Sequence, residues 1–328
     1  MGITSQIVEP LAREHVYKPL RGDALFIGRQ TIYYTAPAIL QLLQEYGIEP
    51  GIDPAAIEID DSTVARAKEF VGEKLITDVS LMKLFGLTKV MALDHSSREN
   101  ADLIHDLCYP VPKALCESAD ILIDGSTLDN VFTPSIVLQN FTRLLRPGGR
   151  MFLINAYSSF ESAYVIMPPM WYVDYFVMNG FADCRVYVML YSDQGCNVFS
   201  ADLKEVHRLG IGMGFFPSAR AGATIVFAEK GEASTSDRLP IQQHYRPPED
   251  WQIYNANLSA MLTSRRPHLS RSNSDLFILD VQGGYRFINR NFIDDHDVAF
   301  ARVRGRAKWL PQKIRRRLVK VRDYIWAS

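Results

Sequence analysis

Residues 119 to 155 read ADILIDGSTLDNVFTPSIVLQNFTRLLRPGGRMFLIN, and the class of fold can be inferred from this segment. The runs ADILID at its start and RMFLIN at its end are apolar on consecutive residues, which is typical of strands covered by helices on both faces. Between them, the apolar spacing predicts a helix from Pro134 to Leu145 that begins after Thr133 and ends at Pro-Gly-Gly, residues 147 to 149. This succession of elements predicts an α/β fold with a mainly parallel sheet.

The same pattern continues on both sides of this segment. Five more apolar runs predict strands at ALFIG (24–28), KVMALD (89–94), ADLIH (101–105), CRVYVMLYS (184–192) and GATIVFAE (222–229), so that seven strands are expected. Helices are expected at residues 37–46, 62–85 and 168–179, the second of them interrupted near Gly72. Helices between the strands and fully apolar strands together predict a doubly wound sheet.

Length and composition indicate a folded chain with more than one part. A chain of 328 residues corresponds to about two domains, or to one large domain with an extension. Hydrophobic residues at 47% and charged residues at 22% exclude a wholly disordered, collagen-like or coiled-coil chain. After Lys230 the sequence becomes rich in Ser, Pro and Gln. We therefore predict a main domain at residues 1–230, a linker at 231–250 and a C-terminal extension at 251–328, in which residues 275–288 form a hairpin.

Charge is distributed unevenly along the chain, although the net charge is only −1. Residues 302 to 322 hold ten basic residues and no acid, whereas residues 1 to 301 hold 26 basic and 36 acidic residues, a net charge of −10. Between Trp309 and Trp326 the apolar residues recur at helical spacing, which predicts a basic amphipathic helix. Two partners fit residues 302–326: an anionic membrane surface, or the acidic body of the chain itself. Nucleic acid fits less well, because the acidic body repels phosphate.

Neither export nor a spanning helix is indicated. No run approaches 18 uncharged apolar residues, and the N-terminal residues lack the basic and then apolar layout of a secretory signal. The four cysteines have no CxxC spacing, so they fit thiols in a reducing cytoplasm and not a disulfide framework or a zinc site. We expect a cytoplasmic protein, or one peripheral to the inner face of a membrane, and nothing in the sequence requires a metal.

Polar residues follow the predicted strands at the points where a parallel α/β sheet binds its ligand. The strands are followed by Arg29-Gln30, Asp94-His95, Asp106-Leu107, Asp124-Gly125 and Ala156-Tyr157. An acid after the second strand can accept two hydrogen bonds from a ribose diol, and an acid after the third can accept one from an adenine amino group. This set favours a ligand that contains adenosine.

At these residues the chain resembles the class I S-adenosylmethionine-dependent methyltransferases, which have a Rossmann-like fold. The resemblance extends over residues 20–230 and is best in 89–155; its most distinctive part is LLRPGGRMFLIN, and DHSSRENADLIHDL and a GRQ turn also match a subgroup. The resemblance implies S-adenosylmethionine as cofactor. The roles that it implies are Asp94 for ribose, Asp106 and Leu107 for adenine, Gly28 and Gln30 beside the methionine moiety, and Asp124, Asp129 or His95 near the acceptor.

The chain departs from the family at the loop after the first strand. Family members usually have G-x-G-x-G there, whereas this chain has only Gly28. Gly28 precedes Asp94 by 66 residues, against roughly 20 in a simple dinucleotide-binding unit, so about forty residues are inserted. We expect the insertion to cover the cofactor end of the sheet, with Gln30, Tyr33 and Tyr34 replacing the lost contacts. A nicotinamide or nucleotide-sugar enzyme is disfavoured, because no GxGxxG follows the first strand.

Two functions therefore stay open. One is transfer of a methyl group to an oxygen or nitrogen of a small molecule or a glycan precursor; the other is a catalytically inactive, methyltransferase-like scaffold in a membrane-proximal assembly. The site residues also have structural alternatives: Asp124 and Asp129 can stabilise a turn, and His95 and His105 can be structural histidines instead of bases. The aromatic residues of 157–176 fit either an acceptor pocket or the core.

Overall fold

The computed structural model describes most of the chain. The residues described are 2–3, 5–60, 74–158, 163–192, 195–201, 222–263, 277–280 and 284–287. The basic segment at 302–326 and residues 62–73, the first half of the interrupted helix predicted at 62–85, lie outside them.

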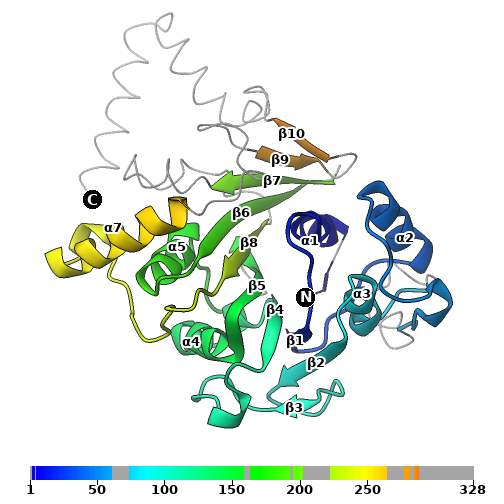
Figure 1. The fold of residues 1–328 in the computed structure, drawn as a ribbon, viewed down its shortest axis with the longest axis horizontal. Coiled ribbons are helices and arrows are strands. Elements are labelled where there is room, and N and C mark those ends of the chain that lie inside the picture. Colours follow the sequence, from blue (N-terminus) through cyan, green and yellow to red (C-terminus); the bar gives the residue numbers. More distant parts are fainter. Residues whose placement is uncertain are drawn as a thin grey trace, which may run out of the picture.

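One mixed sheet runs through the described part of the chain (Figure 1), in the order β10-β9-β7-β6-β8-β5-β4-β1-β2-β3. Its strands are β1 Asp23–Ile27, β2 Lys89–Asp94, β3 Leu103–Ile104, β4 Ala119–Gly125, β5 Leu145–Ser158, β6 Asp183–Ser192, β7 Gly195–Ala201, β8 Gly222–Glu229, β9 Phe277–Asp280 and β10 Gly284–Phe287. All seven strands of the sequence analysis are present, and the hairpin predicted at 275–288 is confirmed as β9 and β10.

The prediction of a mainly parallel sheet is wrong in one half of the structure. Strands β3, β2, β1, β4 and β5 pair in parallel, but β8 lies antiparallel between β5 and β6. Strands β6, β7, β9 and β10 add three further antiparallel pairs. Strand direction depends on the path of the connecting segments, which the apolar pattern of a strand does not encode.

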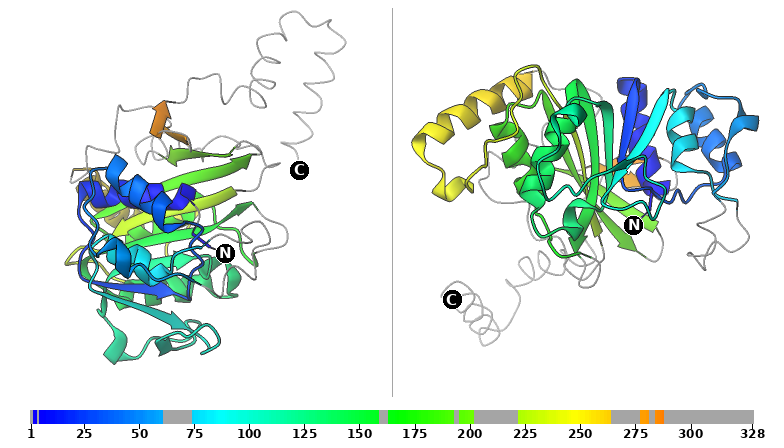
Figure 2. Two further views of the ribbon diagram at one scale, coloured as in Figure 1. Left: turned by 90° about the vertical axis from the view of Figure 1, so that its right-hand side faces the viewer. Right: turned by 90° about the horizontal axis from the view of Figure 1, so that it is seen from below.

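Helices cover both faces of the sheet, as Figures 1 and 2 show. The first layer consists of α4 Pro134–Leu144, α5 Pro169–Met178 and α7 Pro248–Thr263, and the second of α1 Ser5–Tyr17, α2 Ala36–Glu45 and α3 Asp78–Leu84. Successive residues of β1 alternate between the layers: Leu25 and Ile27 pack with the first, Ala24 and Phe26 with the second. Burial on both faces explains why the strand is apolar at consecutive positions.

The helices predicted at 37–46, 134–145 and 168–179 are present within one residue of their expected ends. Thr133, the expected cap of α4, makes no hydrogen bond from its side chain to the helix. In the segment predicted as helix at 62–85, the described helix is α3, where the Thr77 hydroxyl accepts from the backbone N–H of Ser80. Gly148, near the start of β5, has a left-handed φ of +74°, in the stretch where the pairing of β5 with β4 shifts register.

Helix α7 begins inside the segment predicted as a linker, yet it belongs to the same core as the sheet. Its residues Tyr254, Leu258 and Met261 are buried under α5. Arg246, which precedes it, lies 3.0 Å from Asp174 of α5 and has its guanidinium 3.9 Å from the centre of the Tyr254 ring. The division of the chain into a main domain at 1–230, a linker at 231–250 and an extension at 251–328 stays a prediction. In the described residues no helix is long and apolar enough to cross a membrane.

Candidate functional site

The connections of the sheet diverge between β1 and β4. The chain leaves β1 toward α2 and α3 on one face, and it leaves β4 toward α4 on the other face. Open α/β sheets bind ligands outside the carboxyl ends of strands whose connections diverge in this way, and this position at the ends of β1 and β4 is called the crevice below. Gly28 and Gln30 follow β1 at this point, and Gly125 ends β4.

The turn after β1 brings Gly28 against Asp94 of β2. Gly28 has a φ of +70°, and its N–H donates to the Leu93 carbonyl over 2.8 Å. A Cβ at this position would lie 3.3 Å from Oδ2 of Asp94. The backbone conformation therefore favours glycine, and a side chain here would also push the Asp94 carboxylate away by a few tenths of an ångström.

Gln30 lies where the connections that follow β1 and β4 diverge. Its Nε2 donates to the carbonyls of Ile27 and Gly28, and its side chain covers Gly125 so closely that a Cβ there would clash with Oε1. In the described part of the chain this buried Oε1 has no hydrogen-bond partner. A buried acceptor without a donor costs free energy, so this oxygen is suited to a donor that comes from outside the chain.

The two carboxylate oxygens of Asp94 differ in their hydrogen-bond partners. Oδ1 accepts from the Ser96 N–H at 2.9 Å and lies 2.8 Å from Nδ1 of His95. Oδ2, on the side of Gly28, has no partner among the described residues. The side chain of Asp94 is 20% exposed and that of His95 is 78% exposed. A donor from solvent can therefore reach the carboxylate.

Asp106 and Leu107 lie one strand further out. Asp94 pairs with Ile104 of β3, and the His105 N–H donates to the Asp94 carbonyl over 2.8 Å, so Asp106 follows directly at the same end of the sheet. Its Oδ1 accepts from the Cys108 N–H at 2.9 Å, while the residue stays exposed. The structure therefore brings Gly28, Gln30, Asp94, Asp106 and Leu107 to one edge of the sheet.

A buried amide of α4 holds the loop after β3. The Asn140 Nδ2 donates to the carbonyls of Leu107 and Tyr109, over 2.8 and 2.7 Å. Its Oδ1 accepts from the Val111 N–H at 3.2 Å. The sequence analysis missed this residue, although an asparagine amid the apolar face of a helix is a signal that could have found it.

Asp124 and Asp129, two of the predicted catalytic residues, are fully buried. Asp124 accepts from the Thr127 N–H at 2.8 Å, and burial, with a smaller contribution from Asp129, raises its pKa to about 7. Asp129 accepts from the Ser126 hydroxyl at 2.7 Å and from the Ala156 N–H, and burial raises its pKa as well. Both carboxyl groups thus stabilise the turn after β4, and a catalytic role for them stays a prediction.

The same turn stores backbone strain. Ser126 has a φ of +78°, a left-handed conformation that residues other than glycine rarely adopt. The side-chain amide of Asn130 donates to the Ser126 carbonyl over 2.6 Å, and the Thr127 hydroxyl donates to the Ile27 carbonyl over 3.2 Å. The first bond closes the turn on itself, and the second holds the turn against the end of β1. Strain of this kind concentrates at functional sites, and here it lies beside the crevice.

The insertion after β1 reaches the crevice through α3. Asp78, the first residue of α3, accepts from the Gln30 N–H at 3.2 Å and lies 3.4 Å from the Arg29 guanidinium. Arg29 also pairs with Asp102 at 2.8 Å. The sequence analysis missed both acids, because Asp78 fell inside a long predicted helix and Asp102 inside a predicted strand.

Tyr33 and Tyr34 do not join Gln30 at the crevice. Tyr34 packs against the α1–α2–α3 layer, and burial together with Glu9 and Glu45 raises its pKa to about 12. Tyr33 lies against Gly2. Of the three residues expected to replace the lost glycines, the structure places Gln30 in the crevice and these two tyrosines elsewhere.

Most of the described aromatic residues between 157 and 176 belong to the core. Tyr172, Tyr175 and Phe176 are residues of α5 and are buried in the first layer of the core. Tyr164 is 72% exposed and lies with its ring centre 5.4 Å from that of Phe132. Among the described residues of this segment, the aromatic side chains therefore do not gather into one pocket. Within the described residues, no group of three or more His, Cys, Asp or Glu side chains can hold a metal ion.

No protein-family model matches the chain, and no curated protein matches it. Among solved structures it is similar to the CMeT domain of the citrinin polyketide synthase, with 15% identity, a TM-score of 0.33, and 70% of this chain and 52% of that chain covered. It is also similar to phosphoethanolamine N-methyltransferase 2 of Haemonchus contortus, with 11% identity, a TM-score of 0.34, and 69% and 53% covered.

A third similar structure is a putative methyltransferase from Bacillus halodurans, with 8% identity, a TM-score of 0.34, and 68% of this chain and 98% of that chain covered. The alignment spans about half the length of the first two structures. Similarity at this level says nothing about the activity of this chain.

Proposed function

We propose that the chain transfers a methyl group from S-adenosylmethionine to an oxygen or nitrogen atom of a small molecule or a glycan precursor. The observation that carries the proposal is the position of Asp94, whose Oδ2 lacks a partner among the described residues and lies beside Gly28 where the connections diverge. A carboxylate there can accept both hydroxyl hydrogens of a ribose.

The residues around Asp94 fit the rest of the cofactor. Asp106 is exposed at the end of the next strand, where its carboxylate can accept from an adenine amino group. At the other end of the crevice, the buried Oε1 of Gln30 can accept a hydrogen bond from the ammonium of the methionine moiety. The donor set thus suits both ends of S-adenosylmethionine, although the loop after β1 lacks the usual glycines.

Catalysis of this kind depends mainly on alignment. When bound, S-adenosylmethionine supplies an electrophilic methyl group, and the protein must hold the acceptor in line with it. An acceptor that loses a proton also needs a base. His95 suits this role, because Nδ1 faces the Asp94 carboxylate at 2.8 Å and the ring is open to solvent. A donor N–H at Nδ1 leaves Nε2 free to accept the proton.

The inactive scaffold is the second candidate, and Gln30 favours it. Its side chain covers Gly125 in the space above the sheet that a glycine loop would leave open. In that case the chain would keep the fold and bind the cofactor weakly or not at all.

We also propose that residues 302–326 contact an anionic membrane surface, which their ten basic residues and their apolar spacing support.

Calorimetric titration of the full chain with S-adenosylhomocysteine tests the site. Asp94→Asn is expected to weaken binding by about tenfold or more, because a charge-assisted acceptor is lost. Glu249→Gln on α7 is the matched control, since it makes the same chemical change at an exposed position. Equal affinity in the wild type and in Asp94→Asn would remove Asp94 from the site. Absence of binding in every form would favour the scaffold.

A further inference from the structure

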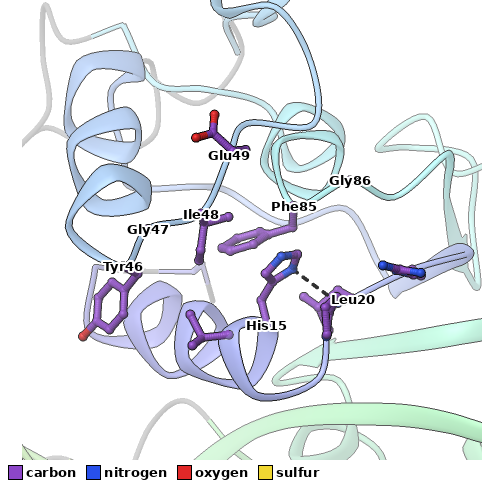
Figure 3. A pocket seen from close by; sticks show the side chains of 11 residues that line it. His15, Leu20, Tyr46, Gly47, Ile48, Glu49, Phe85 and Gly86 are labelled. Carbon is purple, nitrogen blue, oxygen red and sulfur yellow. Dashed lines mark hydrogen bonds between the residues drawn. The ribbon is translucent and has the colours of Figure 1, made fainter.

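A cavity of about 420 Å³ opens at the other end of the sheet. It lies between the end of α1, residues 46–49 after α2 and the turn after α3 (Figure 3). Leu20 and Arg21 line it just before β1, and Phe85 and Gly86 just before β2. The five residues of β1 rise about 3.3 Å each, so roughly 16 Å of strand separate this cavity from Gly28.

The floor of the cavity is apolar. Leu20, Ile48 and Phe85 line it and are almost fully buried. Gly47 and Gly86 border open space, because a Cβ at either position would meet no atom within 4 Å. The volume falls within the range of small-molecule sites, and polar groups share the lining with the apolar side chains.

His15 supplies one directed polar group. Its Nδ1 accepts from the Leu20 N–H at 3.3 Å, so in the neutral imidazole the hydrogen is on Nε2. Burial, together with the charges of Arg150 and Arg21, lowers the pKa of His15 and keeps the ring neutral near pH 7. In the described part of the chain Nε2 has no hydrogen-bond partner. Figure 3 shows the ring beside Phe85, with the two ring centres 5.4 Å apart.

The charges around His15 favour an anion. Arg21 is exposed at the rim of the cavity, and Arg150 lies buried below, where it is 3.6 Å from Glu14. The charges of both arginines disfavour a proton on His15, so each contributes positive potential at the imidazole. Glu49 is the acid on the lining, and Figure 3 shows it on the far side from His15.

We propose that this cavity is a second ligand site that takes a small aromatic carboxylate. The ring of the ligand would lie on Phe85 and Ile48, and its carboxylate would accept hydrogen bonds from Nε2–H of His15 and from the Arg21 guanidinium. An apolar floor with a neutral donor and a cation on one side matches a molecule that has one flat apolar part and one anionic end.

Benzoate is the probe, and the imidazole signals of His15 in NMR spectra of the full chain are the readout. We expect a saturable shift on titration with benzoate, and about tenfold weaker binding of benzamide, which has the same ring without the charge. No S-adenosylmethionine or S-adenosylhomocysteine is added, so the outcome is independent of the methyltransferase proposal.

Two variants and one control complete the test. Val16→Trp changes an exposed residue of the lining and puts a large side chain over the opening; it is expected to abolish the shift. Arg21→Gln, also exposed, is expected to weaken binding about tenfold, and Lys113→Gln is the control that removes a charge at a distant exposed position. The proposal is overturned if benzoate does not shift His15, if benzamide binds equally well, or if both variants bind like the wild type.

Discussion

Replacing Asp124 with asparagine should change how the stability of the fold depends on pH. The carboxyl group is fully buried, and its pKa rises from 3.8 to about 7, chiefly through burial. Between these two values the folded state holds a proton that the unfolded state has lost, so stability falls as pH rises through this window and levels off above it. A shift of this size corresponds to about 4 kcal/mol, of which roughly 2–3 kcal/mol is lost between about pH 5 and about pH 8.

Asparagine has a similar shape and does not ionise. The Oδ1 of asparagine can still accept from the Thr127 N–H, whereas its amide faces the Leu128 N–H, which is 3.4 Å from Oδ2 in the wild type. Asp124→Asn should therefore be less stable than the wild type at low pH, and this deficit should shrink as pH rises.

Urea unfolding of both proteins at about pH 5 and at about pH 8 measures the effect, because other titrating groups cancel in the difference between variant and wild type. Glu249→Gln serves as the control with an exposed carboxylate. If Asp124→Asn shows the same change of stability with pH as the wild type, then the Asp124 carboxyl group is not held protonated in the fold, and the reasoning from its burial fails.

Three further outcomes are expected. Gly28→Ala should weaken binding of S-adenosylhomocysteine in the same titration used for Asp94, because φ is +70° and a Cβ there lies 3.3 Å from the Asp94 carboxylate; unchanged affinity would show that the turn plays no part. Asn140→Leu should destabilise the chain by about 1–3 kcal/mol in urea unfolding, since it leaves the Leu107 and Tyr109 carbonyls and the Val111 N–H without their partner; a neutral effect would mean that water replaces the amide. Deleting residues 302–328 should abolish co-sedimentation with anionic vesicles at low salt, because each basic residue near such a surface contributes about 1 kcal/mol. A full-length chain that stays in the supernatant would end the membrane proposal, and a lower melting temperature after the deletion would favour docking on the acidic body.

The sequence was sufficient for elements whose signal is local. The run ADILID could be recognised as a buried strand, and the Pro134 helix with its Pro-Gly-Gly end could be placed within one residue. Helix α1 escaped notice because Pro10 interrupts its pattern, although Ile7, Val8 and Leu11 are buried. Strand β7 was missed because it is a short run next to the longer β6.

Some residues of the candidate site could be identified from the sequence, and others only from the structure. Gly28, Asp94 and Asp106 could be found from the chain alone, because they directly follow recognisable strands and such ends gather at one edge of a sheet. That Asp124 is buried, and that the charges of Glu9 and Glu45 act on Tyr34, could not be found in this way.

Tertiary contacts set the remaining features. The antiparallel direction of β8, the pairing of Asp78 with Gln30 and the cavity beside His15 all join residues distant in the chain. Hydrophobic periodicity and turn residues act over a few positions, so one sequence reveals them. Burial, strand direction and the pairing of polar atoms depend on which distant segments come into contact in the folded chain. No short stretch of the sequence specifies those contacts.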